Sequence, residues 1–148
     1  MKKILLAIDG SAHSKRAAAV AGELSAGLDI PVDVVNVVSN TASVSAGPIK
    51  EYARIEKIAI TQRDLLQSFG TDLVVDAAST VKESGGGIGS TEVLIGSPAH
   101  EIVHYAESHD ADCIVMGRRG LGDVGGLFLG SVSHKVGHLT ECTLVTTE

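Results

Sequence analysis

Short apolar runs alternate along the chain with segments in which apolar residues recur at helical spacing. The apolar runs, each short enough to be a strand, are residues 4–8, 32–38, 92–95, 113–116 and 143–146. Helical spacing predicts helices after Ser11 to about Leu28, over Pro98–His109 and over Ser131–Leu139. Continuous apolar strands separated by helices are typical of a parallel sheet with right-handed crossovers and helices on both faces. We therefore predict an α/β fold.

The middle of the chain leaves two interpretations open. Residues Ser39–Gly47 are small and polar, which predicts a loop, and a helical pattern starts at Pro48. That helix either continues to Val81 or is interrupted at Gly70 before a strand-like segment at Leu73–Val75. A run of glycines after residue 84 ends it in either case.

Length and composition narrow the class of protein. The 148 residues fit a single domain, 1–148, and the chain is 44% hydrophobic but only 3% aromatic, so its core must be aliphatic. The net charge of −6, without a basic run, argues against a nucleic-acid surface. Asp9 interrupts the first apolar run too early for a signal peptide, and no run is long enough to span a membrane. With two cysteines in apolar contexts, we expect a cytoplasmic protein without a disulfide framework.

A glycine-rich loop follows the apolar run 113–116 and leads into the last predicted helix. Its sequence is Gly117-Arg118-Arg119-Gly120, then nine residues, then Gly130-Ser131. Glycines allow a ligand's oxygens to approach the backbone, and the first-turn N–H groups of a helix favour an anion. Ser131 adds a hydroxyl, while Arg118 and Arg119 either touch the ligand or are solvated surface charges. We therefore predict a phosphate site here, with a ligand-free surface loop as the alternative.

The predicted site extends to other strand ends. Ligands of such sheets bind at the carboxyl ends of the strands, near the point where the strand order reverses. Asp9, Val37 and Gly117 all lie at carboxyl ends of predicted strands, so one pocket can collect them. Asp9 begins an Asp-Gly-Ser turn, where a carboxylate also stabilises the turn or caps a helix. The two roles of Asp9 are compatible.

Two other nucleotide motifs overlap the same loop. Residues Gly120–Gly125 match G-x-G-x-x-G, and Gly125–Gly130 has the glycine spacing of a Walker A motif. The first begins well after the strand, whereas a dinucleotide fingerprint turns directly from strand into helix. In the second, Ser131-Val132 replaces the Lys-Ser/Thr pair that contacts the phosphates and metal. Neither motif is favoured.

Histidines occur at i and i+4 in two predicted helices. His100 to His104 spells H-E-x-x-H, the zinc metalloprotease signature. On the predicted helix, both histidines lie beside the buried apolar stripe, and Glu101 faces away from the core. A catalytic zinc ion needs a third protein ligand, and none follows at the expected spacing. Weak surface metal binding remains open there, and His134 and His138 are expected to be solvated. Since no nucleophile elbow or triad can be assigned either, we predict no catalytic residue.

Three stretches together resemble the universal stress protein family. They are Lys3-Ile4-Leu5-Leu6-Ala7-Ile8-Asp9-Gly10-Ser11, Ala111-Asp112-Cys113-Ile114-Val115-Met116-Gly117 and the G-2x-G-9x-G-(S/T) pattern of the loop. Agreement extends over residues 1–38 and 96–142, and residues 85–89 look like an insertion. The resemblance implies a Rossmann-like fold of the adenine nucleotide alpha hydrolase-like type, with five parallel strands and helices on both faces. It also implies a homodimer formed through the last strand, which here, at Thr143–Thr147, is more polar than is usual in the family.

The resemblance implies an ATP site, because family members with this glycine pattern bind ATP. Ala7 would then lie beside the adenine, and Val37 would offer backbone atoms to it. Met116 and Gly117 would line the base and ribose. Asp9 would contact the ribose or a phosphate-bound Mg²⁺ or Mn²⁺.

The phosphate-binding residues follow from the same resemblance. N–H groups hold the phosphates at Gly120, Gly130, Ser131 and Val132, with Ser133 and Arg119 as further candidates. The implied function is a nucleotide-responsive binding module in the stress response, with at most slow ATP hydrolysis. Two alternatives stay open: an enzyme of the same architecture that adenylates a substrate or hydrolyses ATP, and a nucleotide-free dimeric scaffold.

Overall fold

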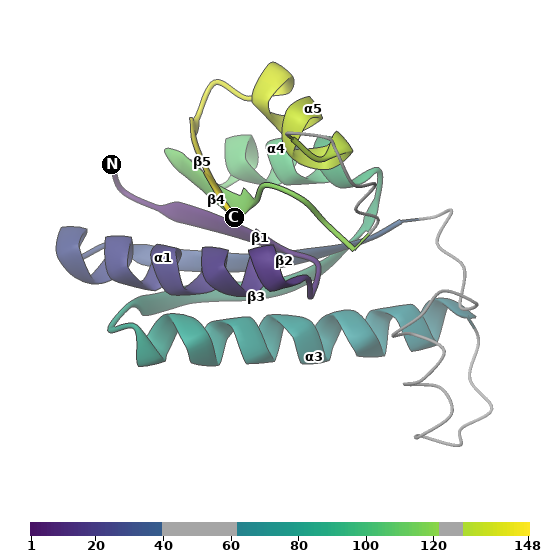
Figure 1. Cartoon of the computed structure of the whole chain (residues 1–148), viewed down its shortest axis with the longest axis horizontal. Helices are drawn as coiled ribbons and strands as arrows, with labels where there is room; N and C mark the ends of the chain where they lie inside the picture. The colour runs from purple at the N-terminus through teal and green to yellow at the C-terminus, as the bar shows by residue number, and fades with distance from the viewer. Residues whose placement is uncertain (40–61, 122–128) are drawn as a thin grey trace.

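A parallel sheet runs through the centre of the molecule. The structure, a computed structural model, describes residues 1–39, 62–121 and 129–148. Within these ranges five strands lie in the order β3-β2-β1-β4-β5 (Figure 1). Their bounds are β1 Ile4–Ile8, β2 Pro31–Ser39, β3 Gly87–Gly96, β4 Cys113–Gly117 and β5 Thr143–Thr147. Every neighbouring pair is parallel, so the predicted five-stranded α/β fold is confirmed.

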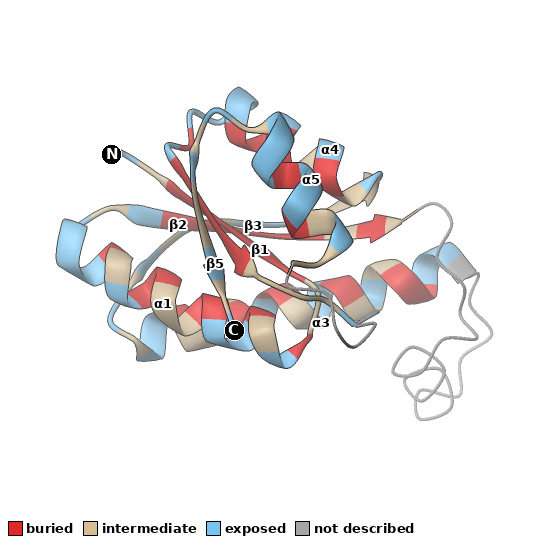
Figure 2. Cartoon of the chain, turned by 45° about the horizontal axis from the view of Figure 1, so that its top comes forward, coloured by how far each residue is buried: buried red, intermediate tan, exposed pale blue. Residues whose placement is uncertain are grey.

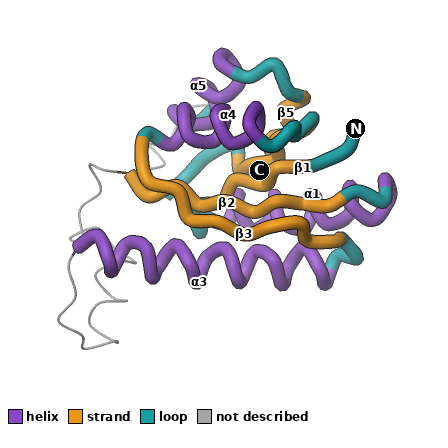
Figure 3. The backbone as a smooth tube through the Cα atoms, turned by 180° about the vertical axis from the view of Figure 1, so that it is seen from behind, coloured by secondary structure: helices purple, strands orange, loops and turns teal. Residues whose placement is uncertain are grey.

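Helices cover both faces of this sheet. Helices α1, Ala12–Leu28, and α3, Gln62–Glu83, lie on one face, and α4, Pro98–Ser108, and α5, Ser131–Leu139, lie on the other (Figures 1 and 3). The strands of the sheet centre are buried from both sides (Figure 2). Alternate residues of β1 face opposite layers: Ile4, Leu6 and Ile8 pack toward α1 and α3, whereas Leu5 and Ala7 pack toward α4. This two-sided burial explains why the strands appear in the sequence as continuous apolar runs.

Helix α1 begins directly after β1 because Ser11 caps it. The Ser11 backbone is extended, and its hydroxyl oxygen accepts a hydrogen bond from the N–H of Ser14 at 3.1 Å. Small side chains, including Ala17 and Ala21, bring the helix close to the sheet. The helix ends at Asp29, which adopts a left-handed conformation with φ 54°.

Helix α3 continues through Gly70 without interruption. Of the two interpretations of this segment, the continuous helix is therefore confirmed. Val74 is 3% exposed and Val75 is 56% exposed, as expected of neighbours on a helix that covers a sheet. At Gly70 a Cβ atom would lie 2.6 Å from Oδ1 of Asn36 and 2.9 Å from Cγ1 of Val93. Glycine is therefore required by close packing on the sheet and does not interrupt the helix. The predicted loop before residue 48 and the helix start at Pro48 lie outside the described residues, apart from Ser39, which ends β2.

Strand β3 begins five residues before the predicted start at Glu92. Gly87 pairs with Pro31 and Ile88 with Val32, and the register then shifts before Val34 pairs with Thr91. The glycine run that looks like an insertion thus forms part of an edge strand. Alternating exposed and half-buried positions in this part of β3 hide it from a search for apolar runs.

Helix α4 contacts the sheet partly through polar groups. The Tyr105 hydroxyl lies 2.9 Å from Oγ of Ser90 and 3.3 Å from Oε1 of Glu92. Nearby, Nζ of Lys3 forms an ion pair of 3.0 Å with the buried carboxylate of Asp33. Burial raises the pKa of Tyr105 above its ordinary value, and the hydrogen bond with Ser90 opposes this shift, while the charges of Asp33 and Glu92 add to it.

We expect the Tyr105 phenol to ionise at higher pH than an exposed tyrosine. The chain has no Trp and two tyrosines, so absorbance at about 295 nm during an alkaline titration follows the phenolates alone. Tyr105→Phe should remove an ionisation step that lies above the ordinary range of tyrosine. Because the folded-state pKa of Tyr105 is raised, its contribution to the free energy of unfolding is present below the unfolded-state pKa and is lost as the pH rises through the folded-state pKa. A Tyr105→Phe variant that keeps the raised step would contradict this assignment.

Candidate functional site

The strand order reverses between β1 and β4, and the predicted base-lining residues meet beside this point. From β1 the chain continues to β2 and β3 on one side, and β4 and β5 lie on the other. Ala7 pairs with Met116 in the sheet, and both are nearly buried, at 5% and 6% exposure. Both belong to the apolar cluster against which Val37 and Val132 pack. Four predicted residues therefore share the sheet face that α4 and α5 cover.

Helix α5 begins next to this cluster with an N-terminus suited to an anion. Its N-cap is Gly130, which provides no side-chain hydrogen bond, and its first turn contains no acidic residue. The N–H groups of a first turn have no partner within the helix, and the helix dipole adds positive potential there. Ser131 is exposed and Val132 is half-buried. The start of α5 can therefore accept a phosphate at the backbone of Ser131 and Val132.

The carbonyl oxygen of Arg118 joins the two ends of the glycine-rich loop. It accepts hydrogen bonds from the N–H of Gly130 and from the hydroxyl of Ser133, both at 2.7 Å. The Ser133 side chain is buried, at 2% exposure. Two predicted phosphate donors, the Gly130 amide and the Ser133 hydroxyl, are thus engaged in closing the loop. Among the predicted donors of residues 130–133, the amides of Ser131 and Val132 are left for a ligand.

Arg118 also connects the loop to the last strand. Its N–H donates to the carbonyl oxygen of Thr147 at 2.7 Å, and its guanidinium forms an ion pair with Glu148. The Thr147 hydroxyl in turn donates to the carbonyl oxygen of His13 at 2.8 Å. Residues of β5, the loop and the start of α1 are therefore linked by direct contacts. No sequence pattern indicates this role of Arg118, because its main contacts are made by backbone atoms.

Asp9 performs the predicted turn role and also contacts the loop. Its Oδ1 accepts a hydrogen bond from the N–H of Ser11 at 2.9 Å, and its Oδ2 accepts one from the N–H of Leu121 at 3.2 Å. Gly120 lies against the same carboxylate, since a Cβ there would be 2.5 Å from Oδ2. A carboxylate has about four lone-pair positions, so these contacts leave room for a cation. Mg²⁺ bound to phosphates needs one or two protein carboxylates, and Asp9 fits that requirement.

The remaining predicted residues lie around the same edge. Gly117 ends β4 directly against the backbone of His13 and Ser14 at the start of α1. The carbonyl oxygen of Arg119 accepts a weak hydrogen bond from the Ser11 hydroxyl at 3.4 Å. His13 has a buried Nδ1 atom without a hydrogen-bond partner. No sequence pattern singled out His13, although its place one residue into the first helix puts it near the strand ends.

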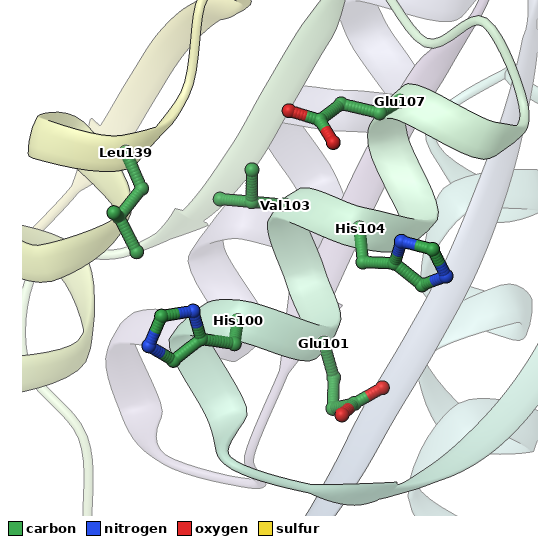
Figure 4. Close-up of a pocket in the computed structure, with 6 residues that line it drawn as sticks. All are labelled: His100, Glu101, Val103, His104, Glu107 and Leu139. Carbon is green, nitrogen blue, oxygen red and sulfur yellow. The ribbon is translucent and has the colours of Figure 1, made fainter.

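The H-E-x-x-H segment lies in the first two turns of α4, which begins just after the carboxyl end of β3. His100 and His104 are exposed, and their rings point in different directions (Figure 4). The Glu101 carboxylate lies against Gly96 at the end of β3. With Val103, Glu107 and Leu139, these three residues line a shallow depression between α4 and α5. In the described ranges, no three histidine, cysteine or acidic residues are grouped so that they could hold a metal. The geometry therefore does not form a protease zinc site. The alternative motifs at Gly120–Gly125 and Gly125–Gly130 extend into residues outside the described ranges.

Comparison with known proteins supports one family. The sequence model of the universal stress protein family matches residues 1–147. A Thermus aquaticus universal stress protein, encoded in the QAH/OAS sulfhydrylase 3′ region, is 38% identical over 91% of this chain and 90% of its own length. The Bacillus subtilis universal stress protein YxiE is 30% identical over 97% of this chain and 96% of its own length. Among the helices that the structure describes, none has the length and apolar character needed to cross a membrane.

Solved structures share the fold at lower identity. A universal stress protein in complex with cAMP superposes with a TM-score of 0.73 and 20% identity, covering 99% of this chain and 97% of the other. The Archaeoglobus fulgidus universal stress protein in complex with dAMP gives a TM-score of 0.69 and 20% identity, covering 100% of this chain and 98% of the other. At 20% identity, the structural similarity establishes a shared fold. Together with the match over residues 1–147, it means that the chain belongs to the universal stress protein family.

Proposed function

We propose that this protein binds an adenine nucleotide, ATP, at the carboxyl edge of β1 and β4. The observation that carries the proposal is the start of α5, which is free of acidic residues and side-chain caps and lies beside the apolar cluster of Ala7 and Met116. An anion-binding helix end next to an apolar surface suits a ligand with phosphates and a flat base. Two universal stress proteins whose structures are complexes with cAMP and dAMP support the choice of an adenine nucleotide.

Each residue then has a role that matches its position. Ala7, Val37 and Met116 contact the adenine, and Gly117 lies beside the ribose. The amides of Ser131 and Val132 bind phosphate oxygens, and Gly120, Gly130 and Ser133 shape the loop that carries them. Arg119 adds positive charge at the same edge. This division assigns phosphate binding to fewer residues than the sequence pattern implies, because the Arg118 carbonyl engages the Gly130 amide and the Ser133 hydroxyl.

A divalent cation, Mg²⁺ or Mn²⁺, completes the site, and Asp9 is the residue that would hold it. The cation would neutralise phosphate charge and so strengthen nucleotide binding. The loop sequence, residues 117–130, contains no histidine, the most common general base. We therefore expect hydrolysis to be slow, and the protein to act as a nucleotide-responsive binding module in the stress response rather than as an efficient enzyme.

The contacts of Arg118 provide a route by which the bound nucleotide can affect the last strand. The residue donates to Thr147 of β5 and accepts from Gly130 and Ser133 at the start of α5. A homodimer formed through β5 would therefore be coupled to the nucleotide site. In this proposal the whole chain is one cytoplasmic domain whose dimer changes with the nucleotide it holds.

Isothermal titration calorimetry tests the proposal directly. We expect ATP with Mg²⁺ to bind once per chain, and inorganic tripolyphosphate to bind at least about tenfold more weakly because it lacks the base that the apolar cluster contacts. Native mass spectrometry of freshly purified protein should show carried-over adenine nucleotide. If ATP gives no heat and no thermal shift at millimolar concentration, and no nucleotide is carried over, the protein is a nucleotide-free scaffold instead.

A further inference from the structure

The side chains of two exposed histidines on α5 contact each other through their ring nitrogens. His134 and His138 are one helical turn apart, and their Nε2 atoms are 3.3 Å apart. The ring centroids are separated by 4.5 Å and the ring planes are inclined by 72°. The opposite face of α5 is fixed in the core by Val136 and Ser133, which are 0% and 2% exposed. The helix therefore holds the two imidazoles on a rigid backbone while solvent can reach both of them.

In this structure the spacing is that of a hydrogen bond between the two rings, and it also matches the separation of two nitrogen ligands on one metal ion. Zinc–nitrogen bonds of about 2.0–2.1 Å at a tetrahedral angle place two ligand nitrogens about 3.3–3.4 Å apart. The observed 3.3 Å between the Nε2 atoms matches that separation. Both rings are exposed and neither packs in the core, so they can give up their mutual hydrogen bond and reorient toward a shared ion. The cost of forming the site is therefore small.

We infer that His134 and His138 chelate a divalent cation of the borderline class that prefers imidazole, with Zn²⁺ as the representative ion. Each neutral imidazole gives one Nε2 lone pair to the metal, and water fills the other positions. No third histidine, cysteine or carboxylate joins the pair in the part of the chain that the structure describes. The net charge of −6 favours cation binding in general. This site is distinct from Asp9, whose oxygen atoms suit the hard cations that accompany phosphates.

The pair His100 and His104 on α4 provides a control within the same chain. These histidines have the same i, i+4 spacing, and they are also exposed. Their rings nevertheless point apart (Figure 4), so chelation requires one or both to change rotamer. Helical spacing and exposure are the same in the two pairs. The pairs differ in the convergence of their nitrogens and in the carboxylates of Glu101 and Glu107, which lie beside the pair on α4. If convergence matters, zinc should prefer the pair on α5.

Zinc titration of the metal-free full-length protein, without nucleotide, tests this inference. We expect His134→Ala and His138→Ala each to weaken zinc affinity at least about tenfold, because each removes one of two protein ligands. His100→Ala and His104→Ala should leave the affinity within about twofold, a difference of less than 0.5 kcal/mol. Histidine ring signals in NMR spectra should shift for residues 134 and 138 at the lowest zinc concentrations.

Two results would overturn the inference. One is an affinity that stays unchanged in the His134→Ala/His138→Ala double variant while circular dichroism shows an intact fold. The other is an equal loss in the α4 and α5 variants, which would mean that zinc binds any pair of surface histidines. Because no nucleotide is present, either result leaves the proposed ATP site untested and unaffected, and failure of ATP binding does not alter the zinc result.

Discussion

Replacing Gly130 by valine is expected to abolish ATP binding while the sheet and its core remain folded. The backbone of Gly130 is extended, with φ −69° and ψ 157°, so valine causes no backbone strain. The conflict arises from close packing, since a Cβ atom would lie 3.0 Å from the Arg118 carbonyl oxygen and 3.2 Å from Cα of Arg119. The two methyl groups of valine need still more room. The hydrogen bonds that close the loop would break, and the first turn of α5 would move away from the phosphates.

A second valine variant controls for the chemistry of the substitution. Gly27 lies in α1, and a Cβ there has no atom within 4 Å. We expect Gly27→Val to bind ATP like the natural chain, and Gly130→Val to lose at least about 100-fold in affinity, or about 2.7 kcal/mol. Calorimetry measures the affinity, and circular dichroism with thermal unfolding checks the fold of both variants. Unchanged ATP affinity in a folded Gly130→Val variant would mean that nucleotide binding does not use this loop.

The strands and helices that the sequence predicted well are those whose signals are local. Residues Cys113–Met116 are apolar because they are buried on both faces of the sheet, and Ser131–Leu139 has both helical spacing and a glycine before its first turn. The start of β3 was missed, because an edge strand with exposed positions has no continuous apolar run. The uncertainty at Gly70 had a different origin. Its glycine fits against Asn36 and Val93, and such a contact between distant segments leaves no local pattern.

In the candidate site, the sequence indicates which side chains are present, but it does not indicate which backbone groups form hydrogen bonds. Residue types and spacing place Asp9, Val37 and Gly117 at the carboxyl ends of strands and predict a loop suited to phosphate. They could not show that the Arg118 carbonyl engages Gly130 and Ser133, because every residue has a carbonyl group. The convergence of His134 and His138 was also invisible, since the rotamers of exposed side chains are not encoded in helical spacing. Sequence therefore predicts a site at this edge, and the hydrogen bonds within that candidate site became visible only in the structure.

Two glycines on α1 are expected to respond in opposite ways to the same substitution. At Gly22 a Cβ atom would lie 2.6 Å from the carbonyl oxygen of Val81 and 2.6 Å from Cβ of Ser84. These atoms belong to the end of α3 and the turn after it, so they can move only if α1 and α3 separate. We expect Gly22→Ala to lower the free energy of unfolding by about 3 kcal/mol, the upper part of the usual range for overpacking.

Gly27→Ala should instead raise the free energy of unfolding by about 0.5 kcal/mol, because alanine is a better helix former and the position is open, although it lies in the last turn. Urea unfolding of both variants, followed by circular dichroism, measures the two values on one scale. A Gly22→Ala variant as stable as Gly27→Ala would show that α1 and α3 do not approach as closely as 2.6 Å implies. If Gly22→Ala alone is destabilised, the contact between α1 and α3 rather than helix propensity sets the requirement for glycine, as it does where α3 packs on the sheet at Gly70.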